Sequence, residues 1–254
     1  MARYRFKQIR LHVAPDLAKG ETLPLDREQT NYLINVMRLK PGAEILVFNG
    51  RHGEWTAVLS QKSRKDGSLT VETKLRDQTQ RPPLDYCFAP LKHARLDYIV
   101  QKATEMGAGR LRPILTRHSQ ATRINMPRMR ANVLEACEQC GVLAVPEILD
   151  PVPMKDFLAT WPTEEPGGRI IFCDEAAEGQ NPLAILNRLK PAPLALLIGP
   201  EGGFSEDERA VLMAMESVTA IPLGPRILRA DTAGVAALAV LQATLGDWRD
   251  ESAS

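Results

Sequence analysis

A glycine-rich loop between an apolar run and a helix start, within residues 194–209, constrains the fold of this chain more than any other feature. The run Leu194–Ile198 is too short for a typical helix and has the length and composition of a buried strand. After the loop at 199–204, Ser205 is followed three residues later by Glu208, which is the pattern of a helix capping box. A strand, a tight loop and a helix in this order place the loop at the carboxyl end of a strand, where ligands bind in open α/β sheets.

The composition of this loop narrows the class of ligand. It lacks the Gly-Lys-Ser/Thr ending of a P-loop, and its glycines at 199, 202 and 203 do not fit the G-x-G-x-x-G pattern of dinucleotide-binding folds. Glu201 adds a negative charge where a phosphate would lie. The loop therefore favours a ligand without phosphates, such as an adenosine-like group carrying a positive centre. A plain tight turn that binds no ligand is the alternative.

A second loop rich in glycine and proline lies further along the chain, at 222–229. It follows the short apolar run Val218–Ile221, which predicts a strand, and it precedes a long apolar segment at 232–245, which predicts a buried helix. Asp231 or Thr232 can cap that helix. Two such loops after consecutive strands can form two walls of one pocket.

Both loops resemble signatures of a known family. Gly-Pro-Glu-Gly-Gly-Phe-Ser from Gly199 and Leu-Gly-Pro-Arg-Ile-Leu-Arg-Ala-Asp-Thr-Ala from Leu223 are similar to motifs of the ribosomal RNA small subunit methyltransferase E family, in the SPOUT class of S-adenosylmethionine enzymes. Segments 36–39, 48–50, 101–107 and 135–141 also fit it, so the resemblance covers most of the chain. It implies an α/β SPOUT methyltransferase domain with a C-terminal trefoil knot, preceded by a small PUA-like β-barrel that binds RNA.

The resemblance also implies an activity and a set of site residues. The family methylates N3 of one uridine in 16S ribosomal RNA of the 30S subunit, uses S-adenosyl-L-methionine as cofactor, and forms a homodimer with the cofactor pocket near the interface. Arg229, to stabilise charge on the uracil, and Asp231, to assist removal of the N3 proton, are the catalytic candidates. The candidates for cofactor binding lie in the two loops: Leu197, Ile198, Gly199, Pro200, Glu201, Gly202, Gly203, Leu223, Gly224, Ile227, Leu228 and Thr232.

Alternatives remain for several of these residues. Arg229 could bind only a phosphate and Asp231 could only cap its helix, while Glu201 could be a solvated turn residue. Asp231 stands where the family usually has Glu, which shortens the reach of the carboxylate, and Val142 stands where the family usually has Arg. A non-catalytic RNA-binding protein with a vestigial cofactor pocket is the competing interpretation of the whole chain.

Charge is distributed unevenly along the chain. Residues 1–130 hold 24 Lys and Arg against 12 Asp and Glu, whereas residues 131–254 hold 8 against 19. This asymmetry favours a polyanionic partner for the basic half, although two ordinary solvated surfaces would look the same in sequence. The candidates for RNA contact are Arg3, Arg5, Arg10, Arg38, Lys102, Arg117 and Arg226.

Hydrophobic periodicity divides the chain into two regions. We expect a β-rich RNA-binding domain at 1–75, a linker at 76–83 that contains a double proline, and the methyltransferase domain at 84–254, where strands and helices alternate as in a largely parallel sheet. Hairpin turns are expected at 49–50 and 66–67. The expected strands lie at 44–48, 54–60, 69–75, 84–91, 110–115, 147–149 and 169–173, and the expected helices at 31–38, 95–106, 127–140, 155–161 and 182–189.

The N-terminus and the four cysteines indicate the cellular compartment in which we expect the protein. No apolar run approaches the roughly 18 residues that a membrane helix needs, and the N-terminus lacks the apolar core of a signal peptide. We therefore expect a cytoplasmic protein with reduced thiols. Cys137 and Cys140 form a single CxxC within a predicted helix, and no histidine stands at metal-ligand spacing, so we expect ordinary helix cysteines and no metal site.

Overall fold

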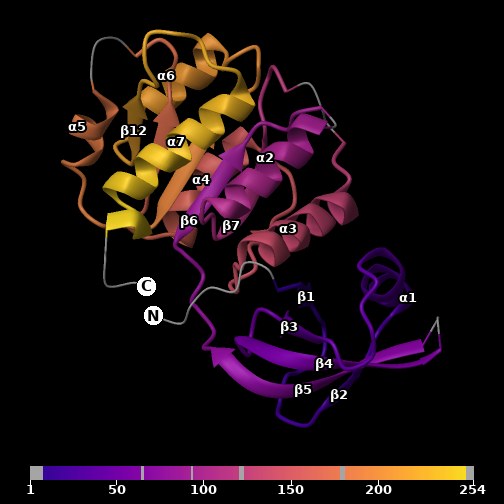
Figure 1. The fold of residues 1–254 in the computed structure, drawn as a ribbon. Helices are drawn as coiled ribbons and strands as arrows, with labels where there is room; N and C mark the ends of the chain where they lie inside the picture. Colours follow the sequence, from indigo (N-terminus) through magenta and orange to yellow (C-terminus); the bar gives the residue numbers. More distant parts are fainter. Residues whose placement is uncertain (1–7, 64–65, 93, 120–122, 178–180, 250–254) are drawn as a thin grey trace. The chain divides into compact units, whose positions relative to one another are not determined.

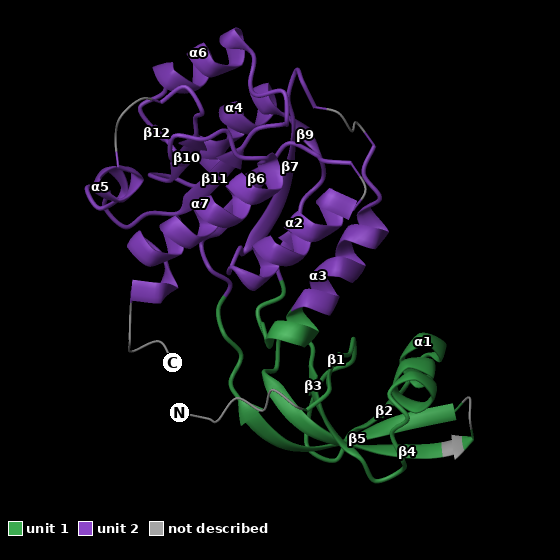
Figure 2. Ribbon diagram, turned by 45° about the horizontal axis from the view of Figure 1, so that its top comes forward, with its two compact units in different colours: residues 1–80, 137–145 green, residues 81–136, 146–254 purple. Residues whose placement is uncertain are grey.

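The computed structural model describes residues 8–63, 66–92, 94–119, 123–177 and 181–249. The chain forms two compact units (Figure 2). Unit 1 contains residues 1–80 and 137–145, and unit 2 contains residues 81–136 and 146–254. The segment 137–145, which the sequence placed in the methyltransferase domain, thus belongs to unit 1.

Unit 1 is built on a five-stranded sheet in the order β1-β3-β4-β5-β2. Strand β1 pairs parallel with β3, and the other pairs are antiparallel. Apolar side chains at alternating positions of β4 and β5 are buried in one core, as expected for strands with one covered face. The bounds are β1 Arg10–His12, β2 Thr22–Pro24, β3 Glu44–Phe48, β4 Glu54–Ser63 and β5 Asp66–Arg76.

Two expectations for unit 1 were wrong in detail. One helix was predicted at 31–38. The structure has the short helix α1 (Arg27–Thr30), which begins with a capping box at Asp26, and the π-helix η1 (Asn31–Val36) directly after it. The predicted turn at 66–67 is instead the first part of β5, because Asp66 stands opposite Ser63 in the sheet. Residues 64–65 lie outside the described residues.

A buried ion cluster ties segment 137–145 to the sheet of unit 1. The Glu54 carboxylate accepts from Arg10 Nε at 2.6 Å and from Arg76 Nε at 2.8 Å. The same two arginines donate to the carbonyls of Glu138 and Gly141. Burial raises the pKa of Glu54, but the hydrogen bonds from Arg76 and Arg10 outweigh it and hold that pKa below its ordinary value. With a side chain only 3% exposed, Arg10 is a structural residue, and its assignment to RNA contact was wrong.

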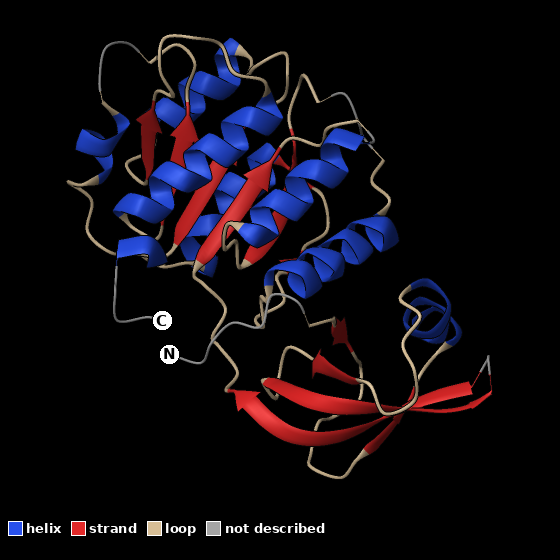
Figure 3. Cartoon of the chain, viewed as in Figure 1, coloured by secondary structure: helices blue, strands red, loops and turns tan. Residues whose placement is uncertain are grey.

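Unit 2 contains a sheet of parallel strands, which Figure 3 draws as red arrows among the helices. The strand order is β12-β10-β11-β6-β7-β8, with β9 paired to β7. Strand β10 lies between β11 and β12, so the connection from β11 to β12 passes over it. The strands are β6 Leu84–Phe88, β7 Arg110–Leu115, β8 Glu147–Ile148, β9 Val152–Pro153, β10 Arg169–Cys173, β11 Leu194–Ile198 and β12 Val218–Ile221.

Helices cover both faces of this sheet (Figure 1). On one face α4 and α6 pack over an apolar core that includes Leu197 and Trp161. On the other face α7 approaches β6 closely, because a Cβ at Gly234 would collide with Tyr86. The helices are α2 Ala94–Glu105, α3 Met126–Cys140, α4 Met154–Glu164, α5 Pro182–Leu186, α6 Glu206–Ala214 and α7 Ala230–Thr244, and the 3₁₀ helix η2 is Asp247–Arg249.

The alternation of strands and helices expected for the second region is confirmed, as is the capping box of Ser205 and Glu208 at the start of α6. The expected cap of α7 was wrong: Arg229 occupies the N-cap position without a side-chain hydrogen bond, and Asp231 and Thr232 lie inside the first turn. The trefoil knot stays a prediction. Among the described residues no helix combines the length and the apolar character needed to cross a membrane.

Candidate functional site

A cavity of about 1080 Å³ lies in unit 2, at the carboxyl ends of the adjacent strands β10, β11 and β12. This is the edge at which parallel sheets bind ligands. Three loops line it: the one after β11, the one after β12 and the one after β10. Arg95 of α2 and Arg209 of α6 complete the lining.

The first loop owes its shape to close packing around Gly199 and Gly203. A Cβ at Gly199 would lie 2.6 Å from the ring of Phe204, and that ring packs edge-on against Phe172 with centroids 5.2 Å apart. Gly203 has a φ of 68°, a conformation that other residues adopt at a cost, and a Cβ there would lie 2.8 Å from a Glu175 oxygen. These positions therefore require glycine.

The loop that follows β7 contacts the first loop. His118 Nδ1 lies 3.1 Å from the Gly203 carbonyl, and the Arg117 backbone N–H donates to Glu208 of α6. A Cβ at Gly202 would point toward His118 rather than into the cavity. His118 thus supports the first loop.

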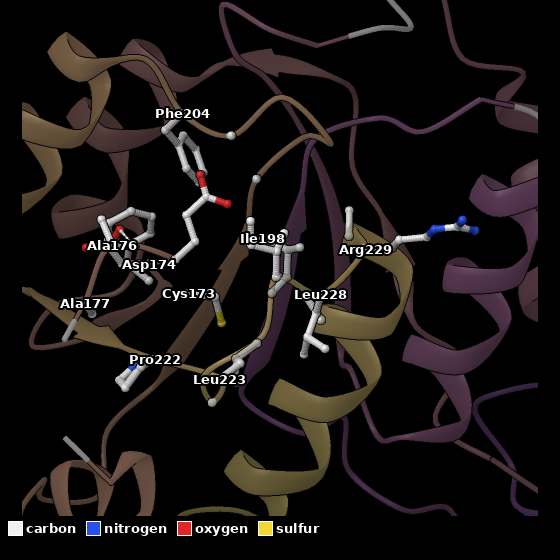
Figure 4. Close-up of a pocket in the computed structure, with 18 of the residues that line it drawn as sticks. Cys173, Asp174, Ala176, Ala177, Ile198, Phe204, Pro222, Leu223, Leu228 and Arg229 are labelled. Carbon is white, nitrogen blue, oxygen red and sulfur yellow. Dashed lines mark hydrogen bonds between the residues drawn. The ribbon is translucent and has the colours of Figure 1, made fainter. Parts of the chain in front are cut away.

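The second loop supplies the apolar wall of the cavity. Pro222, Leu223 and Leu228 line it (Figure 4), and Ile227 lines it with a side chain that is 88% exposed. Figure 4 shows the Arg229 side chain extending away from Cys173 and Leu223. An exposed apolar side chain beside basic residues is suited to contact with a large partner at the cavity mouth.

The third wall was missed by sequence reasoning. It consists of Cys173 at the end of β10 and the residues that follow it. The buried Asp174 carboxylate accepts from Arg209 Nε at 3.1 Å and Nη2 at 2.9 Å, a forked pair that holds this loop against α6. Burial raises the pKa of the Cys173 thiol, so at neutral pH it is an uncharged lining group. The available signal was the polar pair Asp174-Glu175 directly after a buried strand.

Arg95, near the start of α2, was also missed. Its Nη1 forms an ion pair with Glu201 Oε1 of the first loop, and its Nε lies 3.9 Å from Asp231 Oδ2 at the start of α7. Asp231 Oδ1 accepts from the Thr232 backbone N–H at 2.8 Å. One arginine thus faces a carboxylate from each of the two motifs recognised in the sequence.

The predicted cofactor residues fall into two groups. The cavity is lined by Ile198, Gly199, Pro200, Glu201, Gly203, Leu223, Gly224, Ile227 and Leu228. Three others do not line it: Gly202, Leu197, which packs against α4 and α6 on the opposite face of the sheet, and Thr232, which lies beyond the first residue of α7. Strand alternation explains Leu197, because successive side chains point to opposite faces.

The basic candidates differ in their surroundings. Arg226 lines the cavity, and Arg117 is 69% exposed with Asp207 at 3.9 Å. Lys102 is half-buried and paired with Glu105. Arg38 is exposed in unit 1 with a φ of 54°. Arg3 and Arg5 lie outside the described residues.

Among the described residues no cluster of three or more His, Cys, Asp or Glu side chains has the arrangement of a metal site. Cys137 is buried and Cys140 is exposed, so the two thiols lie in different environments. Burial raises the pKa of Cys137 to about 12. A thiol with this pKa is a structural, unreactive group.

Comparison with known families gives two matches. A profile described as an RNA methyltransferase domain matches residues 79–242, and one described as an RNA methyltransferase PUA domain matches residues 25–72.

Two curated relatives carry the same description, ribosomal RNA small subunit methyltransferase E. The protein of Rickettsia conorii is 28% identical over 97% of this chain and its own full length. That of Synechocystis is 30% identical over 93% of this chain and 78% of its own length.

Two solved structures are similar over almost the whole chain. A structure from Legionella pneumophila with the cofactor SAM bound has a TM-score of 0.80 and 28% identity, covering 93% of this chain and 98% of its own. A structure described as ribosomal RNA small subunit methyltransferase E of Neisseria gonorrhoeae, bound to S-adenosyl methionine, has a TM-score of 0.77 and 25% identity, covering 92% of this chain and 97% of its own.

Proposed function

This chain belongs to the ribosomal RNA small subunit methyltransferase E family of RNA methyltransferases, and we propose that it methylates N3 of a uridine in the 16S RNA of the 30S subunit. The observation that supports this most is the cavity at the carboxyl ends of β10, β11 and β12, whose loops carry both motifs of the family. The relatives are named for action on ribosomal RNA, and the two solved structures bind the cofactor.

The residues of the cavity fit S-adenosylmethionine. Its volume of about 1080 Å³ is ample for a ligand of this size. Ile198, Leu223 and Leu228 offer an apolar surface for a purine. The carboxylate of Glu175 can accept from an amino group or face a cationic sulfonium, while Glu201 is paired with Arg95. Gly199 and Gly203 hold the first loop in the shape that lines the cavity, since a Cβ at either would meet Phe204 or Glu175.

The bound cofactor supplies an activated methyl group, so the protein's main task is alignment and control of the N3 proton. The proton on N3 passes to a carboxylate, for which we propose Asp231, and the N3 electron pair forms the new bond to carbon while the electrons of the broken carbon–sulfur bond stay on sulfur. We propose that Arg229 supplies positive charge near the uracil as it loses this proton. Arg229→Ala should abolish transfer while it keeps cofactor affinity.

We assign RNA contact to exposed basic residues. Arg38 in unit 1, and Arg117 and Arg226 in unit 2, are exposed and suited to phosphates. A 30S substrate would place the reaction in the cytoplasm. Homodimer formation, with the cofactor pocket near the interface, is part of the same proposal, and the outer surface of α7 is where we expect the second copy.

The test is transfer of a labelled methyl group from S-adenosylmethionine to 30S subunits and to naked 16S RNA, both taken from cells that lack this protein. We expect incorporation, with a preference for 30S if unit 1 reads the assembled shape. Calorimetric titration with the cofactor runs in parallel. Cofactor binding without methyl transfer to either RNA would refute the proposal that 16S RNA is the substrate. Neither binding nor transfer would favour a non-catalytic RNA-binding protein.

A further inference from the structure

Arg95 lies at the junction of the two ligand loops and is not used in the function proposed above. Its guanidinium is paired on one side with Glu201 Oε1, and on the other its Nε is 3.9 Å from Asp231 Oδ2. The side chain of Arg95 is 41% exposed and that of Asp231 is 18% exposed, so solvent and ligands can reach both. Arg95 lines the cavity itself.

Helix stability does not account for an arginine at this position. Arg95 is in the first turn of α2, where the positive end of the helix dipole disfavours a cation. A half-exposed ion pair such as Arg95–Glu201 adds little to stability. The placement of this guanidinium therefore indicates a role toward a ligand, with Glu201 fixing its orientation.

The distance between Arg95 and Asp231 also indicates a role toward a ligand. At 3.9 Å, Nε and Oδ2 are too far apart for a direct hydrogen bond. An N–H donor that lines the cavity and the carboxylate of Asp231, which directly follows the lining residues Arg229 and Ala230, thus stand side by side. The edge of uracil has the complementary pattern, because its N3–H donor is next to a carbonyl acceptor.

We propose that Arg95 and Asp231 together read this edge of the target uracil: Arg95 donates to the carbonyl oxygen beside N3 while Asp231 accepts the N3–H. Loss of the proton moves negative charge onto that oxygen, so the hydrogen bond from Arg95 strengthens as the reaction proceeds. Cytosine presents an unprotonated N3, which cannot donate to Asp231. If the carbonyl that Arg95 contacts is O4, cytosine also replaces that acceptor with an amino donor. The pair therefore selects uracil as well as assisting its ionisation.

This inference rests on the proposed function, and Arg95→Ala tests it. Removing one donor to a developing oxyanion lowers kcat by roughly 100-fold, and we expect that loss for methylation of 30S subunits at neutral pH, with less than a threefold change in cofactor Kd. The deficit should shrink as pH rises, because the uracil then ionises without help. Added guanidinium ion should restore part of the activity of Arg95→Ala, and Arg95→Lys should keep more activity than alanine.

Arg81→Ala is the matched control. Arg81 is in unit 2, is 46% exposed and pairs with Glu147 at 2.7 Å, but it does not line the cavity. It should show wild-type activity and pH profile. The double variant with Asp231→Ala should lose little more than either single variant, because the two residues contact one edge.

The outcomes separate this inference from the function on which it rests. No methylation of uridine by the wild type would overturn the proposed function. Methylation by the wild type, with Arg95→Ala equally active, or with a deficit that neither alkaline pH nor guanidinium reduces, would overturn the role of Arg95 and leave the function in place.

Discussion

Replacing Gly203 with alanine should weaken cofactor binding by an amount that follows from the backbone of the first loop. Gly203 has a φ of 68°, and its N–H donates to the Pro200 carbonyl at 2.9 Å, which closes the turn. An L-residue in this left-handed region costs about 1–2 kcal/mol. The nearby Glu175 oxygen, 2.8 Å from the added Cβ, belongs to a flexible side chain that can move away. The backbone cost therefore dominates.

The loop can relieve this strain only by leaving the conformation that binds the cofactor. Binding must then restore that conformation, so the 1–2 kcal/mol appears in the dissociation constant. At about 1.4 kcal/mol per factor of ten, Kd should rise by about 5–30-fold. Isothermal titration calorimetry with S-adenosylmethionine measures this directly.

Gly167→Ala is the control for backbone strain alone. Gly167 lies in unit 2 between α4 and β10 with a φ of 77°, and an added Cβ meets nothing within 4 Å. Its variant should lose a similar amount of thermal stability and keep the wild-type Kd. If Gly203→Ala also keeps the wild-type Kd, the conformation of the first loop is not part of the cofactor site.

Three further predictions concern the rest of the chain. Arg38→Gly should raise the free energy of unfolding by about 1 kcal/mol, measured by denaturation, because glycine suits the φ of 54°. The same variant should reduce the salt dependence of RNA binding by about one phosphate contact, measured by salt titration. Unchanged RNA binding would remove Arg38 from the RNA interface. Glu54→Gln should lower the free energy of unfolding by about 3–5 kcal/mol at pH 7, because it removes the carboxylate charge that pairs with the buried Arg10 guanidinium. The pKa of Glu54 is lowered in the folded state, so its charge stabilises the fold at pH values above the ordinary glutamate pKa, and this stabilisation is lost as pH falls. The difference in free energy of unfolding between wild type and variant should therefore shrink in acid. A difference that stays constant down to the acid transition would contradict this. Gly234→Val should cost about 1–3 kcal/mol by overpacking against Tyr86 and Ile99, measured by urea denaturation, and an unchanged midpoint would show that α7 can move off β6.

Local sequence patterns were enough to predict most elements of unit 2. The run Leu194–Ile198 and the Ser205–Glu208 pair fix a strand end and a helix start through residues that are adjacent in sequence. The order of the strands depends on contacts between distant residues. No local pattern shows that β10 lies between β11 and β12, and for this reason the third wall, with Asp174 and Glu175, was missed.

The errors at charged residues have a related cause. Arg10 and Arg38 look alike as basic residues of a β-rich region, yet one is buried against Glu54 and the other is exposed. Arg95 precedes the motif at 101–107 but is unremarkable in sequence. Its relevance arises only when the starts of α2 and α7 and the first loop meet in space.

The central claim is that the cavity of unit 2 directs a methyl group to N3 of uridine. The most direct test is to digest the RNA of 30S subunits methylated by this protein and to identify the labelled nucleoside by mass spectrometry against synthetic standards. The account predicts N3-methyluridine as the product, formed by the wild type and strongly reduced with Arg95→Ala and with Asp231→Ala. A label on the ribose 2′-oxygen, on a carbon of the base or on another base would contradict it.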